Sequence, residues 1–290
     1  MNATWRGTRQ PPAGPVPNAP ARFDQVLAHA RADNRAALAT YLPAGYPTQA
    51  QSLRILHRLA EVTDVIELGW PYSEPSLDGP VIQKAAAQSL AAGFRVRHLL
   101  ESIHSLAASP ASVLVMAYYP PLFRYGLDRA AHDLAQAGAA GVILPDLPIE
   151  EAHGWLSAAR SAGLHTVFVV APSTHDARLT RICSAAGGML YAPAVPGITG
   201  STGPLHPALP AFVHRLRTVT DLPIGVGIGI STAAQAQAAS RIADVTIVGS
   251  ALIRAIDAAQ GTCQQEEAAA DFARALTAGL HRRDTPRAAA

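Results

Sequence analysis

This chain of 290 residues has few cysteines and few aromatic side chains. It also has few charged residues and no long apolar run. The two cysteines, Cys183 and Cys263, are too few for a disulfide framework and lack metal-site spacing. We interpret them as buried or idle thiols in a reducing compartment. The eleven histidines form no H-E-x-x-H pattern and no cluster with ligand spacing, so the sequence predicts no metal site.

Charge and hydropathy exclude two further classes of protein. The formal net charge is +2, and no dense Lys/Arg block is present. A nucleic-acid-binding surface would concentrate basic residues on one face, so no nucleic-acid partner is expected. No apolar run reaches membrane-spanning length, and the N-terminus has no apolar signal core. We therefore expect a cytoplasmic protein with no membrane partner.

What the sequence does contain is a repeated alternation of strand and helix patterns. Short, nearly continuous apolar runs are typical of parallel strands that are covered on both faces. Between them lie stretches with apolar residues at helical spacing. The predicted strands are Ala37–Pro43, Val62–Gly69, Ser112–Tyr118, Gly141–Pro145, Thr166–Ala171, Met189–Ala192, Ile224–Gly227 and Val245–Gly249. The predicted helices are Gln49–Ala60, Asp128–Ala137, Glu150–Ala162, Pro207–Arg217, Thr232–Ala239 and Ala268–Leu280, with N-caps at Thr48, Asp128 and Ser231.

This alternation predicts an α/β fold, a single-domain (β/α)8 TIM barrel over residues 21–280. An open sheet would usually carry its glycine-rich phosphate turn after the first strand, and here such turns follow the last two. Residues 1–20, rich in Pro, Gly and Asn, predict a disordered N-terminal arm, and residues 281–290 a flexible C-terminal tail. In this fold, active sites are built at the C-terminal ends of the strands.

One acid lies near the end of the second predicted strand, and another follows it in the next loop. Burial of Glu67 among apolar neighbours would raise its pKa and make it a proton donor near neutral pH, whereas a salt bridge at the rim is an equally weighted alternative. Asp78, in the next loop, either reaches into the barrel mouth or caps the following helix, and the cap is favoured for this residue alone. As a pair, they predict one carboxylate that stays ionised and another that exchanges a proton.

Two glycine-rich turns follow the seventh and eighth predicted strands. They read Gly227-Ile-Gly-Ile-Ser231 and Gly249-Ser-Ala-Leu252. Glycine lets the backbone approach an anion closely, and helix starts at about Ser231 and Ser250 would offer free N–H groups. Their position predicts a phosphate site, with simple tight turns as the alternative.

Other residues at predicted strand ends are candidates for the rim of the site. The polar, glycine-rich segment Pro196–Gly203 is either a lid over the substrate or a surface loop. Asp146, Tyr118 and Tyr191 follow or end three different strands. Each either lines the mouth or forms rim hydrogen bonds, and the second interpretation is favoured for the tyrosines.

With these motifs in place, the chain resembles the family of the tryptophan synthase α subunit and its relative, the stand-alone indole-3-glycerol-phosphate lyase. The resemblance runs from about Phe23 to Leu280. Its most specific stretch, I-E-L-G-W-P-Y-S-E-P-S-L-D-G-P-V-I-Q at residues 66–83, is similar to the family's E-L-G-x-P-[FY]-S-D-P-x-x-D-G-P-x-I-Q signature. Shorter matches follow in order at residues 124–126, 145–151, 197–200, 227–231 and 248–251.

The resemblance implies a lyase of tryptophan biosynthesis that cleaves indole-3-glycerol phosphate to indole and glyceraldehyde 3-phosphate, with no cofactor on this chain. It implies that Glu67 is the general acid–base, protonating indole C3 and handling the glycerol hydroxyl proton. Asp78 would hold the indole N–H and stabilise an indolenine-like intermediate. The implied substrate-binding residues are Tyr118, Tyr191, Thr199, which would close the lid, and Asp146. The implied phosphate-binding residues are Gly200, Gly229, Gly249 and Ser250.

Three positions depart from the family pattern. Glu74, Pro120 and Val195 stand where Asp, Asn and Arg are usual. In the family these positions lie near the surface that meets a β subunit, so Pro120 and Val195 are expected to weaken an α2β2 heterotetramer. An α subunit that passes indole to a pyridoxal-phosphate β subunit is the favoured interpretation. The alternatives are a stand-alone lyase that releases free indole, an idle regulatory homologue, or another phosphosugar enzyme on the same barrel.

Overall fold

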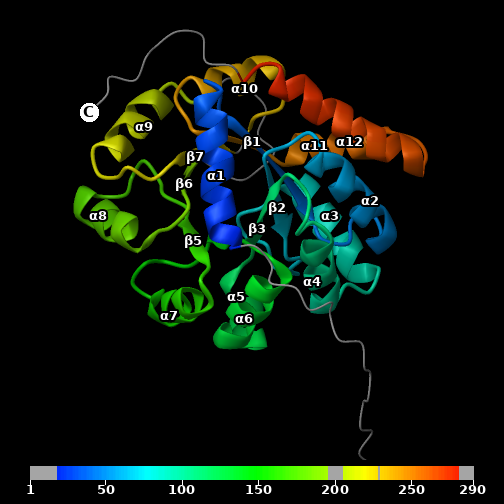
Figure 1. Ribbon diagram of the computed structural model, residues 1–290, viewed down its shortest axis with the longest axis horizontal. Coiled ribbons are helices and arrows are strands. Elements are labelled where there is room, and N and C mark those ends of the chain that lie inside the picture. Colours follow the sequence, from blue (N-terminus) through cyan, green and yellow to red (C-terminus); the bar gives the residue numbers. More distant parts are fainter. Residues whose placement is uncertain (1–17, 195–204, 228, 281–290) are drawn as a thin grey trace, which may run out of the picture.

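The strands of this protein close into a parallel barrel. The computed structural model describes residues 18–194, 205–227 and 229–280. Within them, eight parallel strands lie in the order β5-β4-β3-β2-β1-β8-β7-β6. A bridge between Val169 and Tyr191, together with a 2.9 Å hydrogen bond from the Val170 N–H to the Tyr191 carbonyl, joins the β5 and β6 edges. The predicted (β/α)8 barrel is confirmed (Figure 1).

All eight predicted strands are present, with ends that differ from the prediction by at most three residues. Continuous apolar runs were an effective guide because both faces of each strand are covered, one by the barrel interior and one by helices. The strands are β1 Ala37–Pro43, β2 Val65–Gly69, β3 Ser112–Met116, β4 Gly141–Leu144, β5 His165–Phe168, β6 Leu190–Pro193, β7 Ile224–Gly227 and β8 Val245–Val248.

The helices surround the barrel. Six of the described helices, α1, α3, α4, α5, α8 and α11, have no counterpart among the predicted helix ranges, although helix starts were expected after Asp78 and at about Ser250. The first six are α1 Ala19–Ala32, α2 Gln49–Ala60, α3 Pro80–Ala91, α4 Val96–Ser105, α5 Tyr119–Tyr125 and α6 Leu127–Ala137. The remaining six are α7 His153–Ala162, α8 Asp176–Ala185, α9 Leu209–Arg217, α10 Ala233–Ser240, α11 Ser250–Ala258 and α12 Thr262–Thr277.

One of the three predicted helix caps is confirmed. Thr48 caps α2, its side chain accepting the Gln51 N–H at 3.4 Å. The cap at Asp128 is wrong, because Gly126 occupies that position and Asp128 lies in the first turn of α6. The cap at Ser231 is also wrong, because Thr232 caps α10, accepting the Gln235 N–H at 3.2 Å. These two helices therefore begin two residues before and one residue after the positions that the side-chain types indicated.

Helix α1 seals the N-terminal end of the barrel. Its Phe23, Leu27 and Ala30 pack in one cluster with residues of the barrel interior such as Val65 and Leu114. Figure 1 shows α1, in blue, lying across the middle of the ring of helices. With this end filled by apolar side chains, the space for chemistry is left at the C-terminal ends of the strands.

The predicted terminal segments lie almost wholly outside the described residues. Residues 1–17 and 281–290 fall there, so the arm and the tail stay predictions. The arm was predicted to end at Pro20, but α1 begins at Ala19, and the Asn18 side chain accepts the Ala21 N–H at 3.4 Å. Among the described residues, no helix has the length and apolar character needed to cross a membrane.

Candidate active site

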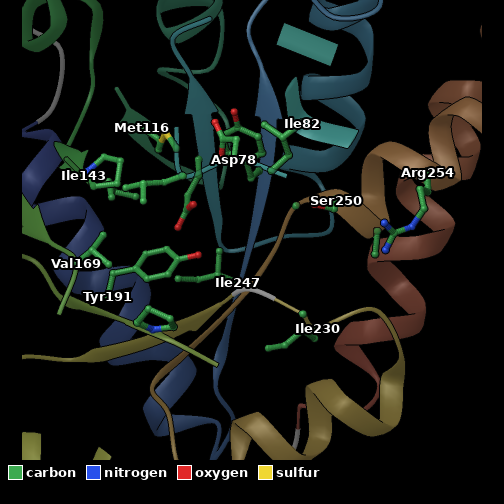
Figure 2. A pocket seen from close by; sticks show the side chains of 18 residues that line it. Asp78, Ile82, Met116, Ile143, Val169, Tyr191, Ile230, Ile247, Ser250 and Arg254 are labelled. Carbon is green, nitrogen blue, oxygen red and sulfur yellow. The ribbon is translucent and has the colours of Figure 1, made fainter. Parts of the chain in front are cut away.

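A cavity opens where the strands end, and side chains of six strands reach it directly. Figure 2 shows the side chains that converge on it. Most of its wall is apolar, as in many small-molecule sites, where a few polar groups fix orientation. The apolar wall includes Ile82, Met116, Ile143, Val169, Ile230 and Ile247. The polar groups are concentrated in two places, one beside β2 and one at the start of α11.

Glu67 is the buried acid of the site. It lies in the middle of β2, in register with Tyr41 of β1 and Leu114 of β3, and its side chain lines the cavity. The residue is only 2% exposed, and its Oε1 has no hydrogen-bond partner among the described residues. Burial raises the pKa of this carboxyl to about 8. No described ion pair involves Glu67, so the structure favours the proton donor over the rim salt bridge.

Asp78 is the second buried acid and lines the same cavity. Its Oδ1 has no hydrogen-bond partner among the described residues. Burial raises the pKa of the Asp78 carboxyl to about 6, and a hydrogen bond from the Tyr118 hydroxyl limits that rise. The alternative role as a helix cap is not seen, because Gly79 occupies the N-cap of α3 without a side-chain bond.

Tyr118 and Asp146 were predicted to contact substrate, but neither is among the residues that line the cavity. The Tyr118 hydroxyl also accepts the Leu77 N–H at 3.1 Å, so it fixes the loop that carries Asp78. The Asp146 carboxylate accepts the Tyr119 N–H, with N–O distances of 2.9 and 3.1 Å, at the start of α5. Both residues form rim hydrogen bonds, which the residues alone favoured for Tyr118 and left as the alternative for Asp146.

Two tyrosines line the cavity, and only Tyr191 was predicted. Tyr41 of β1 reaches over Gly69, where an added Cβ would lie 2.5 Å from its hydroxyl oxygen. Tyr191 of β6 reaches over Gly227 in the same way, and a Cβ there would collide with its hydroxyl. Burial raises the pKa of both phenols well above the usual value, so both stay neutral donors. The register between the strands, which sequence alone does not give, places the side chain of each tyrosine against its glycine.

The two glycine-rich turns differ in what they offer an anion. Helix α11 begins at Ser250 with no side-chain cap, and the buried Ser250 Oγ has no partner among the described residues. By contrast, the N–H groups of Ser231 and Thr232 donate to Gln235 Oε1 at 2.8 and 3.1 Å. The prediction of free N–H groups at Ser231 is therefore wrong, and the first turn of α11 is the open anion site.

Some of the other predicted phosphate and lid residues lie within the described part of the chain, and the rest lie outside it. Gly229, Gly249 and Ser250 line the cavity, and Gly229 adopts a left-handed φ of +88°. Thr199 and Gly200 lie outside the described residues, as does Val195, so their roles stay predictions. Arg254 of α11 also lines the cavity, and no sequence motif pointed to it. Within the described ranges, no group of three or more His, Cys, Asp or Glu residues could hold a metal ion.

The arrangement suits general acid–base chemistry on a phosphorylated apolar molecule. With pKa values of about 8 and about 6, Glu67 is mostly protonated and Asp78 mostly ionised at neutral pH. Environments that separate the pKa values of two carboxyls also separate their roles into acid and base. The apolar wall accommodates a ring, and the first turn of α11 attracts an anion.

Comparison with known proteins gives a consistent result. The family model described as tryptophan synthase alpha chain matches residues 27–281. The tryptophan synthase alpha chain of Mycobacterium marinum is 40% identical over 266 residues, covering 91% of this chain and 97% of that one. That of Thermobifida fusca is 44% identical over 261 residues, covering 88% and 96%.

Solved structures agree with the sequence matches. A chain of Mycobacterium tuberculosis tryptophan synthase superposes with a TM-score of 0.83 at 39% identity, covering 90% of this chain and 98% of that one. Tryptophan synthase subunit alpha from Legionella pneumophila superposes with a TM-score of 0.81 at 31% identity, covering 89% and 97%. The similarity therefore extends over nearly the whole of each relative.

Proposed function

Because this chain belongs to the tryptophan synthase alpha chain family, we propose that its cavity cleaves indole-3-glycerol phosphate, with Glu67 and Asp78 as the catalytic residues. The products are indole and glyceraldehyde 3-phosphate. The observation that carries the assignment of roles is the pair of buried carboxyls, each with one oxygen unpartnered among the described residues, in one cavity. Buried polar atoms normally have partners, so such atoms at a cavity wall are available to a substrate.

Proton transfer at indole C3 is the role we assign to Glu67. Its protonated carboxyl donates to C3, which places the positive charge on the ring nitrogen of an indolenine-like intermediate. The resulting Glu67 carboxylate then takes the proton of the glycerol hydroxyl next to the scissile bond. The C–C bond breaks, its electrons return to the ring, and the hydroxyl carbon becomes the aldehyde. Glu67 ends protonated, so the cycle consumes no proton and needs no cofactor.

Asp78 holds the ring nitrogen during this cycle. Its ionised carboxylate accepts the indole N–H and stabilises the positive charge that C3 protonation creates. This electrostatic interaction is stronger than it would be in water, because Asp78 is only 3% exposed and the cavity wall is mostly apolar. Tyr191 and Tyr41 contact the ring region, and the first turn of α11 binds the phosphate at the other end of the cavity.

Replacement of each carboxyl tests the assignment. Glu67→Gln keeps the size and hydrogen-bonding capacity of the side chain but cannot transfer a proton, so we expect kcat to fall about 10²–10⁴-fold. Asp78→Asn is expected to lower kcat/KM by a similar factor. Glu74→Gln, an exposed carboxyl in the same loop, is the control and should retain wild-type turnover. Indole release from either acid variant at the control's rate would refute the proposed roles.

The partner we propose is a tryptophan synthase β subunit in an α2β2 complex. Pro120, which replaces the family's Asn, is exposed in the first turn of α5, close to Phe123, whose side chain is 64% exposed. A proline there offers no side-chain amide to a partner, so the interface is expected to be weak. Restoring Asn at Pro120 and Arg at Val195 should strengthen the complex, and unchanged affinity would count against this explanation.

The presence of Pro120 in place of the family's Asn also motivates a second candidate function. In this candidate, the protein is a lyase that releases free indole without a partner. Indole release from the chain alone, and then with a β subunit of the same source, separates the two. Slow release that rises strongly on addition of the β subunit identifies a synthase subunit. Fast release that the β subunit leaves unchanged identifies the stand-alone enzyme.

A further inference from the structure

The end of the cavity at α11 carries a cation that the catalytic scheme does not use. Among the described residues that line the cavity, Arg254 is the only Lys or Arg. It stands four residues after Ser250, so the two side chains lie on one face of α11. Long helical side chains lean toward the helix N-terminus, which directs the guanidinium of Arg254 back toward the first turn. Figure 2 shows Ser250 and Arg254 on the same side of the cavity, away from Asp78 and Met116.

Within the parts of the chain that the structure describes, no carboxylate forms an ion pair with Arg254. The nearest acid along the helix is Asp257, and its carboxylate accepts a hydrogen bond from the Tyr46 hydroxyl. Arg254 is a half-buried residue beside an apolar cavity, and no described carboxylate compensates its charge, so it favours an anionic ligand.

Two further observations identify the class of anion. The first turn of α11 has no side-chain cap, so its N–H groups are open to an acceptor. The Ser250 Oγ is buried and has no partner among the described residues, so it can donate to the same ligand. Several donors around one point suit a phosphate, which has three terminal oxygens, better than a single carboxylate.

We propose that Arg254 binds the phosphate of the substrate together with Ser250 and the first turn of α11, and so selects phosphorylated over unphosphorylated substrates. This inference rests on the proposed cleavage of indole-3-glycerol phosphate. The guanidinium supplies full positive charge where the helix terminus supplies only a partial one. Because it lies at the end of the cavity away from the carboxyls, it acts on substrate affinity rather than on proton transfer.

Steady-state cleavage kinetics test this with three variants. We expect Arg254→Met to raise the KM for indole-3-glycerol phosphate about tenfold, with kcat within about twofold of wild type. Arg254→Lys should restore part of the affinity, because lysine keeps the charge but not the bidentate geometry. Arg241→Met removes an exposed arginine at the far end of α10 and should leave KM unchanged. Equal KM for wild type and Arg254→Met would overturn the inference.

A binding measurement separates this inference from the proposed function. Calorimetric titration with glycerol 3-phosphate reports on the phosphate site without any cleavage. We expect wild type to bind it about tenfold more tightly than Arg254→Met, while both proteins unfold at the same temperature. If wild type binds glycerol 3-phosphate but cleaves no substrate, the proposed function fails and the phosphate role of Arg254 stands. Equal affinity in the two proteins would overturn that role even if cleavage is normal.

Discussion

At the scale of single residues, the charge on Asp78 depends on one hydroxyl. Burial raises the pKa of Asp78 to about 6, and the hydrogen bond from Tyr118 opposes that rise by favouring the ionised form. Tyr118 is itself buried and lies outside the cavity lining, so it acts through Asp78 and not on the substrate. It is therefore a positioning residue for the second acid.

Tyr118→Phe isolates this contribution. Loss of the hydroxyl is expected to raise the pKa of Asp78 by about 1–2, because a hydrogen bond to a charged group contributes about 1.5–3 kcal/mol. Activity requires ionised Asp78, so the fall of kcat/KM at acid pH should begin at higher pH than in wild type. Tyr125→Phe, which removes a hydroxyl bonded to Asp133 at 2.6 Å, is the matched control. Coincident acid limbs in the two variants would show that Tyr118 does not control this ionisation.

Sequence reasoning located the two acids but not all of their neighbours. Glu67 and Asp78 belong to a continuous signature. The burial of Glu67 was predicted from its apolar neighbours, whereas the residues around Asp78 favoured a helix cap and did not predict its burial. Tyr41 and Arg254 were not predicted to line the cavity. The position of Tyr41 depends on strand register, and that of Arg254 on the direction of a helical side chain. The free donors expected at Ser231 were wrong because Gln235, four residues later, turns back to accept them.

At the scale of elements, α1 is a helix that the sequence analysis did not predict. Only Phe23, Leu27 and Ala30 are buried on this helix, one narrow stripe in a polar segment. Helix α8 is similar, with only Leu179 and Ile182 buried. Patterns this sparse do not stand out from loops, whereas every strand was an apolar run and was found. The strands, which are covered on both faces, were all predicted, whereas these two sparsely buried helices were not.

The contribution of α1 can be measured by removing one ring. Phe23 is completely buried where α1 packs into the barrel interior, so Phe23→Ala is expected to lower the free energy of unfolding by about 3–5 kcal/mol. The matched control is Phe123→Ala on α5, which removes an identical ring that is 64% exposed and should change stability by less than about 0.5 kcal/mol. Urea denaturation measures both. Because Phe23 lies at the end of the barrel away from the acids, kcat should stay near wild type. Similar stability losses in the two variants would contradict a sealing role for α1.

At the scale of the whole molecule, the barrel maintains a buried acid at a cost in stability. Glu67 forms no ion pair with any described residue, and burial raises its pKa from the ordinary 4.5 to about 8. The folded state therefore keeps a proton that the unfolded chain releases above about pH 4.5. Stability linked to this group is highest in acid and falls as pH rises toward about 8, above which both states are ionised.

Glu67→Gln removes this linkage and makes the effect measurable. Between about pH 5 and pH 8, the free energy of unfolding of wild type should fall relative to that of Glu67→Gln by about 1.4 kcal/mol per pH unit. Glu74→Gln, which removes an exposed carboxyl from the neighbouring loop, should follow wild type across the range. Parallel curves for wild type and Glu67→Gln would mean that Glu67 is already ionised at neutral pH, and it would then have no proton to donate to indole C3. The same pH series of kcat should decline through about pH 8 as Glu67 loses its proton, so stability and catalysis report one ionisation.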